Sequence, residues 1–245
     1  MRRVLFHCFG WPIHSYPAML YVGIVLGIYA QLFAALSLGL DTTRVFAATI
    51  ILVAAALLGA RLLHVVPNWQ HYRKHPRDIL KVSAGGASMY GGLLLGFPLS
   101  YPVLGVLEIP FGAYWDTCSF TMLIGMTITR AGCFLNGCCA GRATTAWWGV
   151  NLPDYRGIWR RRIPLQILEA CWGIVVTSGA LLLWGRLGFG GAIFLYALGA
   201  YGVGRIVLET LRDAPDRVRG ISLHRVLSAI FVATSLSAFA VAWLS

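Results

Sequence analysis

The stretch PAMLYVGIVLGIYAQLFAALSL, Pro17–Leu38, decides the class of fold. It contains no charged residue and no histidine over its whole length. An α-helix that crosses the hydrocarbon core of a bilayer needs about 20 mostly apolar residues. The stretch therefore predicts a membrane-spanning helix.

The composition extends this prediction to the rest of the chain. Of its 245 residues, 58% are hydrophobic and 12% are charged, with a mean hydropathy of +0.71. Soluble domains usually carry about 25% charged residues. This excludes a disordered chain, a disulfide scaffold and an ordinary soluble enzyme. The start, Met1–Trp11, has a broken apolar run and no small-x-small cleavage site, so we expect no cleavable signal peptide.

We predict an all-α integral membrane protein with about seven transmembrane helices in a single membrane domain over residues 1–245. The expected spans are Pro17–Leu38, Val45–Val66, Gly85–Leu107, Tyr114–Asn136, Pro164–Trp184, Phe189–Leu208 and Ile221–Trp243. The third span is rich in glycine and proline, and we expect it to be broken near its start. Basic and aromatic residues alternate in an arm at residues 67–84 and a head segment at 137–163, which predicts that both lie at the membrane interface.

The net charge of +11 does not indicate nucleic-acid binding. The basic residues are distributed between apolar spans rather than gathered on one soluble face, so we expect anionic headgroups as their partners and no nucleic acid. With seven spans, 15 of the 20 Lys and Arg lie on the side of the N-terminus. The positive-inside rule then predicts that this side is cytoplasmic.

Two arginines near span ends indicate a binding site. A charged group at the bilayer centre costs at least about 2.5–3.5 kcal/mol. Arg130 and Arg205 both fall near span ends that face the same side if the spans alternate. A guanidinium group binds phosphate through two parallel hydrogen bonds and keeps its charge. We therefore predict a cavity that recognises an anionic headgroup. For Arg61, a functional role and a side chain that simply extends to the interface explain the sequence equally well.

Other polar residues are expected at the same depth in the membrane as these two arginines. Tyr201 and Glu209 lie one helical turn before and after Arg205, and so share its helix face. The remaining candidates at this level are Tyr16, Gln166 and Glu169. The two glutamates either orient the arginines or are simple ion-pair partners.

The cysteines form one dense group, CFLNGCC at Cys133–Cys139. A zinc site usually shows spaced cysteine pairs with further partners. The C-x4-C-C spacing has no second pair and no nearby histidine, so we expect no metal and no cofactor. A disulfide or a reactive thiol at Cys133 or Cys138 stays open, because the positive charge of Arg130 would lower a thiol pKa. Cys118 and Cys171 fit packing positions.

Five segments, in order, resemble the prolipoprotein diacylglyceryl transferase family. They are HSYPAMLY at His14–Tyr21, GGASMYGG at Gly85–Gly92, RAGCFLNGCCAGR at Arg130–Arg142, RIPLQILEA at Arg162–Ala170 and YGVGRIVLETLRDAPD at Tyr201–Asp216. The third is similar to the family signature Gly-Arg-x-Gly-Asn-Phe-x-Asn-Gly-Glu.

The resemblance implies a reaction as well as a fold. The family transfers a diacylglyceryl group from phosphatidylglycerol to the lipobox cysteine thiol of a prolipoprotein signal peptide, releases glycerol phosphate, and works in the bacterial cytoplasmic membrane. By motif position, Arg130 and Arg205 would bind the phosphate. Further catalytic or substrate-binding positions implied in this way are Tyr16, Asn136, Gly141, Tyr201 and Glu209. Tyr90 is a catalytic candidate at a position where the family has another residue, and Gln166 is a substrate-binding candidate because of its level on the fifth span. The resemblance also places the N-terminus outside, against the charge bias, and we take that orientation as our expectation.

The chain departs from the family pattern at three positions. Tyr90 stands where the glycine-rich motif of the family has histidine, and Cys133 and Cys138 stand where the signature has asparagine and glutamate. Tyrosine, with an ordinary pKa of about 10, is a weaker base at neutral pH. These differences leave the phosphate-binding positions intact but change those expected to activate the acceptor thiol.

Three alternatives therefore stay open. The chain could use a different acceptor, could be a non-catalytic lipid-binding relative, or could transport an anion with the same arginines. Transporters usually have two inverted halves, each with a broken helix. We expect only one broken segment and find no internal repeat, which favours the transferase over transport.

Overall fold

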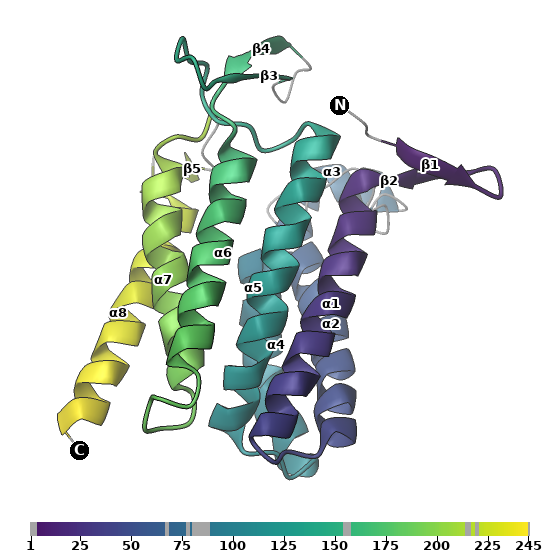
Figure 1. Cartoon of the computed structure of the whole chain (residues 1–245). Coiled ribbons are helices and arrows are strands. Elements are labelled where there is room, and N and C mark those ends of the chain that lie inside the picture. Colours follow the sequence, from purple (N-terminus) through teal and green to yellow (C-terminus); the bar gives the residue numbers. More distant parts are fainter. Residues whose placement is uncertain are drawn as a thin grey trace. The chain divides into compact units, whose positions relative to one another are not determined.

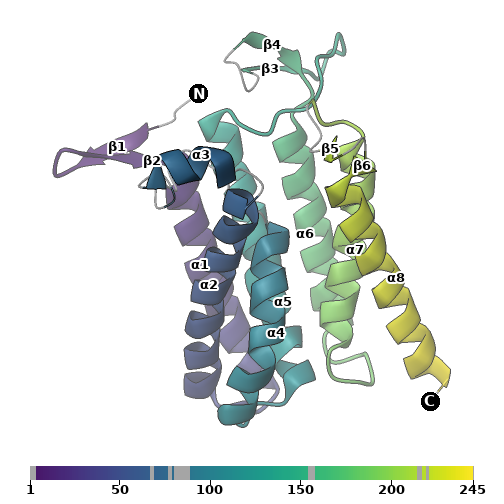
Figure 2. The same ribbon diagram turned by 180° about the vertical axis from the view of Figure 1, so that it is seen from behind.

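The structure is a computed structural model that describes residues 4–66, 69–76, 79, 89–153, 158–213, 217–218 and 221–244. Within these residues six helices are long and apolar enough to cross a membrane (Figures 1 and 2). They are α1 (Ser15–Ser37), α2 (Thr42–Val65), α5 (Phe111–Asn136), α6 (Leu165–Leu183), α7 (Ala192–Glu209) and α8 (Leu223–Leu244). The predicted all-α membrane class is confirmed, and the protein is a multi-pass membrane protein.

The third predicted span is the shorter helix α4, Met89–Val106. It continues through Pro98 and Pro102, which lie inside the helix. The start of the predicted span at Gly85, near which we expected a break, lies outside the described residues. From Met89 onward the segment is a regular helix despite its glycines and prolines.

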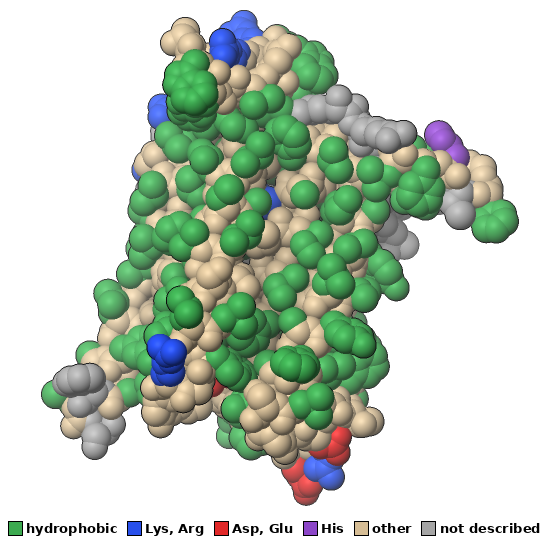
Figure 3. Space-filling view, in the orientation of Figure 1, with side chains coloured by type: hydrophobic (Ala, Val, Ile, Leu, Met, Phe, Trp, Pro, Cys, Tyr) green, Lys and Arg blue, Asp and Glu red, His purple; other side chains and the backbone are tan. Residues whose placement is uncertain are grey.

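The sides of the helices carry exposed apolar side chains, as expected of surfaces that face lipid (Figure 3). Leu181 and Leu182 on α6 and Leu236 on α8 are each more than half exposed. Along the apolar stretch of α8, only 11% of the residues are buried inside the structure. In water such surfaces would be an aggregation hazard, whereas hydrocarbon solvates them without cost.

The chain divides into two compact units, Leu32–Tyr114 and the remainder, Met1–Gln31 with Trp115–Ser245. In the first unit, Asp41 caps the start of α2, because its carboxylate accepts hydrogen bonds from the backbone N–H groups of Thr43 and Arg44. This satisfies two of the free N–H groups at the helix start. Helix α2 packs closely on α4 because Gly59 and Gly91 face each other: a Cβ at either would collide with the carbonyl oxygen of the other. The short helix α3, Trp69–Lys74, belongs to the same unit.

The second unit holds most of α1 and α5, all of α6, α7 and α8, and three short antiparallel hairpins. The hairpins pair β1 (Val4–Cys8) with β2 (Trp11–His14), β3 (Val150–Pro153) with β4 (Trp159–Arg162), and β5 (Arg217–Val218) with β6 (Ile221–Ser222). The β3–β4 hairpin lies in the predicted head segment and exposes Trp159, and Trp147 before it is also exposed. The interfacial roles of the head and the arm remain predictions.

A buried carboxylate aligns α7 with α5 inside this unit. Helix α7 starts at Gly191, which has a φ of 98° and offers no side-chain cap. Asp116 of α5 supplies the cap, because its carboxylate accepts hydrogen bonds from the Gly191 N–H at 2.7 Å and the Phe194 N–H at 3.0 Å. Arg130 and Arg205 follow Asp116 and Gly191 by the same number of residues, equivalent to a rise of about 21 Å along each helix. Because α5 and α7 run in the same direction (Figure 1), the two arginines reach the same level.

Candidate active site

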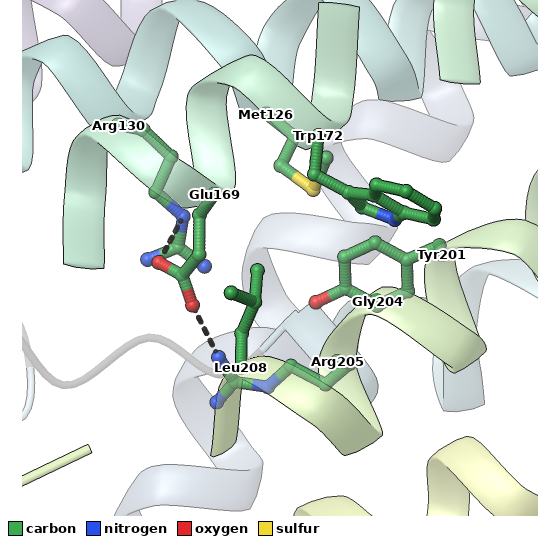
Figure 4. A pocket seen from close by; sticks show the side chains of 8 residues that line it. All are labelled: Met126, Arg130, Glu169, Trp172, Tyr201, Gly204, Arg205 and Leu208. Carbon is green, nitrogen blue, oxygen red and sulfur yellow. Dashed lines mark hydrogen bonds and ion pairs between the residues drawn. The ribbon is translucent and has the colours of Figure 1, made fainter. Parts of the chain in front are cut away.

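The two predicted arginines meet at one carboxylate. Arg130 Nε lies 3.0 Å from Glu169 Oε2, and Arg205 Nη1 lies 2.6 Å from Glu169 Oε1 (Figure 4). The three side chains come from α5, α7 and α6, and their exposed fractions are 17%, 7% and 6% in the order Arg130, Arg205, Glu169. In so buried a setting, charge pairing and direct hydrogen bonds are required to offset the cost of desolvation.

A second carboxylate and a third arginine complete the cluster. Glu209 Oε2 lies 3.0 Å from Arg205 Nη2 and 3.2 Å from Arg212 Nε. Arg212 Nη2 also lies 3.0 Å from Glu169 Oε1. Three guanidinium groups thus share two carboxylates, which leaves one positive charge uncompensated within the cluster. We call these five residues the arginine–carboxylate cluster.

The two predicted arginines, Arg130 and Arg205, differ in how many of their donor nitrogens contact a carboxylate. Arg205 gives both Nη nitrogens to carboxylates, and its buried Nε has no hydrogen-bond partner in the part of the chain that the structure describes. Arg130 contacts Glu169 through Nε alone, and its two Nη nitrogens have no partner among the described residues. A guanidinium group with both Nη nitrogens free can bind phosphate with two hydrogen bonds. Arg130 is therefore the better placed of the two to receive an anion.

A pocket opens beside this cluster. It is lined by Met126, Arg130, Glu169, Trp172, Tyr201, Gly204, Arg205 and Leu208 (Figure 4). The space between these side chains, about 240 Å³, includes open solvent.

The indole of Trp172 forms one wall of the pocket. Its Nε1 donates a hydrogen bond to the carbonyl oxygen of Ala200 at 3.0 Å. The ring can lie against α7 only because residue 204 is glycine: a Cβ at Gly204 would overlap the indole. Gly204 thus sets the distance between the indole and the helix that carries Arg205 and Tyr201.

The structure brings together only part of the predicted set. Arg130, Arg205 and Tyr201 line the pocket, whereas Glu209 is not part of its lining and pairs with Arg205 and Arg212. The side chain of Tyr90 lies outside the described residues, although its backbone is in the first turn of α4.

Four other predicted residues, Tyr16, Asn136, Gly141 and Gln166, do not line the pocket. Gln166 is fully buried, and its Nε2 donates a 2.5 Å hydrogen bond to the Cys138 carbonyl oxygen. Gly141 lies between two chain segments, since its N–H binds the Ile163 carbonyl oxygen and a Cβ there would meet the Leu211 carbonyl oxygen at 2.9 Å. Asn136 ends α5. Tyr16, in the first turn of α1, lies within electrostatic range of Arg130 and the cysteine group. Substrate contacts of these four residues remain predictions.

The cysteines of the signature segment lie together. The sulfur atoms of Cys133, Cys138 and Cys139 are all within 4.8 Å of one another. Hydrogen bonds from the other two thiols, together with nearby Arg130 and Arg212, lower the pKa of Cys139 below that of an ordinary thiol. We call these three residues the cysteine turn.

Known proteins match the chain over nearly its whole length. A family model described as prolipoprotein diacylglyceryl transferase matches residues 3–241. The chain belongs to the prolipoprotein diacylglyceryl transferase family. It is 28% identical over 232 residues to the phosphatidylglycerol–prolipoprotein diacylglyceryl transferase of Clostridioides difficile strain 630, covering 95% of this chain and 92% of that protein. It is also 28% identical over 249 residues to the enzyme of the same name from Streptococcus pyogenes serotype M5 strain Manfredo, covering 96% and 93%.

Sequence reasoning missed several residues of this pocket and of the arginine–carboxylate cluster. Arg212 lies three residues beyond Glu209, which is the spacing of neighbours on a helix face, but the helix ends at Glu209 and Arg212 follows in a turn. Trp172 lies three residues after Glu169 on α6 and could have been found from that spacing. No local signal indicates Met126 or Leu208, which are ordinary apolar residues until the helices are placed side by side.

Proposed function

We propose that this protein transfers a diacylglyceryl group from phosphatidylglycerol to the lipobox cysteine thiol of a prolipoprotein. The observation that carries the proposal is the pocket in which the two Nη nitrogens of Arg130 contact no other described residue, within a five-residue cluster that has one more positive charge than negative charges. Positive charge held in place at the leaving oxygens is the main help that a protein can give to such a reaction. The names of the similar bacterial proteins support the same donor and acceptor.

In the proposed reaction the acceptor sulfur forms a bond to the terminal glyceryl carbon of the lipid. The bond between that carbon and the phosphate oxygen breaks, and glycerol phosphate leaves with the bonding electrons. The proton of the acceptor thiol passes to a base. Arg130 binds the phosphate through its Nη nitrogens, and Glu169 and Glu209 hold Arg205 beside it. Tyr201, which lines the pocket, contributes a phenol to the headgroup site.

The test is a reaction with purified components. The full chain in detergent is incubated with phosphatidylglycerol and a lipobox peptide, and the peptide is analysed by mass spectrometry. The proposal expects a peptide whose mass rises by one diacylglyceryl group and an equal amount of released glycerol phosphate. A peptide in which serine replaces the lipobox cysteine is the matched control. Lipid binding without an adduct would instead favour the non-catalytic relative.

The proposal includes an orientation in the bacterial cytoplasmic membrane, with the N-terminus outside and the C-terminus in the cytoplasm. An alkaline phosphatase fused after Ser245 should then be inactive, and a fluorescent protein at the same place should fold and fluoresce. An active phosphatase fusion would contradict this orientation and support the one given by the positive-inside rule.

A further inference from the structure

The cysteine turn has a geometry that the transfer reaction does not explain. Its origin is the way α5 ends. The Cys138 N–H donates to the Cys133 carbonyl oxygen at 3.1 Å, and the Gly137 N–H donates to the Phe134 carbonyl oxygen at 3.2 Å. With Gly137 at a φ of 77°, this is a Schellman motif, in which the side chain after the glycine folds back on the last full turn of the helix.

The motif accounts for the contact between two of the cysteines. Cys133 and Cys138 occupy the two positions whose side chains a Schellman motif brings together, normally as a hydrophobic contact. Spacing along the sequence therefore understates how close these sulfurs lie. The C-x4-C-C spacing, with no second cysteine pair, led us to expect no metal site. In the folded chain that spacing is no longer evidence against one.

The third sulfur reaches the group through an unusual backbone conformation. Cys139 has a φ of 63°, in the left-handed region that non-glycine residues rarely adopt. Such strain persists only where the surroundings impose it. Gln166 imposes part of it from α6, because this fully buried amide donates to the Cys138 carbonyl oxygen, while its own Oε1 meets no hydrogen-bond partner among the described residues.

We propose that Cys133, Cys138 and Cys139 together bind a soft divalent cation such as Zn²⁺ through their three sulfur atoms. Thiolates lie about 2.3 Å from zinc, so that three of them in one coordination sphere lie roughly 4 Å apart. Sulfur atoms that are already within 4.8 Å of one another need only a small adjustment to reach this arrangement.

The charges around the turn suit the bound state. Three thiolates and one divalent cation carry a net single negative charge. Arg130 precedes Cys133 by one helical turn, and the cluster that it shares with Arg212 has an uncompensated positive charge. The site would therefore neutralise that charge when no lipid phosphate is present. Within the described residues the group has three members, so one tetrahedral position stays open to a ligand from outside.

Access to the site is also suitable for metal exchange. Cys133 is only 3% exposed, but Cys138 and Cys139 are partly exposed. The buried sulfur would anchor the cation, and the other two would exchange it with solution or with a carrier. Soft thiolate ligands select zinc, cadmium and copper(I) over magnesium and calcium.

The test uses the full chain in detergent, without a histidine tag and fully reduced. Cd²⁺ is added, and the ultraviolet charge-transfer absorbance of sulfur–cadmium bonds is followed. We expect one tight site per protein, with Zn²⁺ displacing Cd²⁺ and Mg²⁺ having no effect. Replacing Cys133, Cys138 and Cys139 by serine should abolish the signal, whereas the matched Cys118→Ser/Cys171→Ser variant should keep it.

Two further measurements keep the inference open to refutation. If the triple variant fails to fold, Cys139→Ser alone, at a partly exposed position, should weaken Cd²⁺ binding at least about ten-fold, because the loss of even an outer-shell partner of a metal ligand costs about 10–100-fold in affinity. Binding that is equal in wild type and Cys139→Ser would overturn the proposal. So would a reduced protein that takes up no Cd²⁺ but whose oxidised form has lost two hydrogens, since the turn would then be a disulfide site.

Discussion

Two regions at the end of α5 hold their side chains together by different means. In the arginine–carboxylate cluster, every contact is an ion pair, and the arrangement depends on matched charges from α5, α6, α7 and the turn after α7. The cysteine turn starts three residues later on α5. There the backbone conformation sets the arrangement, and the side chains meet because the helix ends in a Schellman motif. The first region therefore depends on tertiary packing, whereas the second is largely encoded by local sequence.

Neutralising the shared carboxylate should have the largest effect and should break only the first region. Glu169→Gln leaves three arginines with one carboxylate, and breaking a buried ion pair costs about 3–5 kcal/mol. We expect a marked fall in the thermal unfolding midpoint of the purified protein in detergent. Glu108→Gln is the control, since Glu108 also pairs with an arginine, at 2.7 Å, but is 77% exposed. Equal shifts in both variants would show that the cluster is not what holds these helices together.

The donors of Arg130 should matter mainly for turnover. Arg130→Lys keeps the charge but loses the planar fork of two Nη nitrogens. Removing one preorganised donor from an anion site lowers the rate by about 10²–10³-fold, and we expect a loss of that order with phosphatidylglycerol and the lipobox peptide. Arg205→Lys should lose activity and also unfold at lower temperature, because Arg205 is tied to both carboxylates. The exposed Arg186→Lys is the control. Near-normal turnover in both cluster variants would exclude a phosphate clamp.

A smaller effect is expected from the pocket wall. Gly204→Ala places a methyl group where the Trp172 indole lies, so the ring or α7 must shift. A displacement of about 1 Å in a positioned site costs up to 10²-fold, and we expect roughly a ten-fold lower kcat/KM with little loss of helix content by circular dichroism. Gly105→Ala is the control, because a Cβ there meets nothing within 4 Å. An unchanged kcat/KM for Gly204→Ala would show that the indole does not shape the donor site.

The same contrast explains how much the sequence predicted. Hydropathy located the spans to within a few residues, as in Pro17–Leu38 against the observed Ser15–Ser37, because the need for apolar surface is local. Arg130 and Arg205 were identifiable because charge inside an apolar span is costly. Arg212 was not, since it lies outside a span and joins the cluster only through the turn after α7. The closeness of the cysteines could have been predicted from Asn136-Gly137 at a helix end, but spacing rules for metal sites overlook that turn.

The smallest effect on turnover should come from the cysteine turn, and this separates the two regions most sharply. Cys133→Ser/Cys138→Ser keeps the Schellman backbone and leaves Arg130 and its partners unchanged, so transfer to the lipobox peptide should stay within about three-fold of wild type, a difference below 1 kcal/mol.

Tyr90→Phe should instead be severely impaired. Its phenol stands where the family has histidine, and it can position a thiol or phosphate by a hydrogen bond without acting as a base. Both variants are assayed with phosphatidylglycerol and the lipobox peptide, with helix content checked in parallel. An active Tyr90→Phe protein beside an inactive double-serine protein would reverse the assignment, because the thiols would then belong to the transfer chemistry and the two regions would form one site.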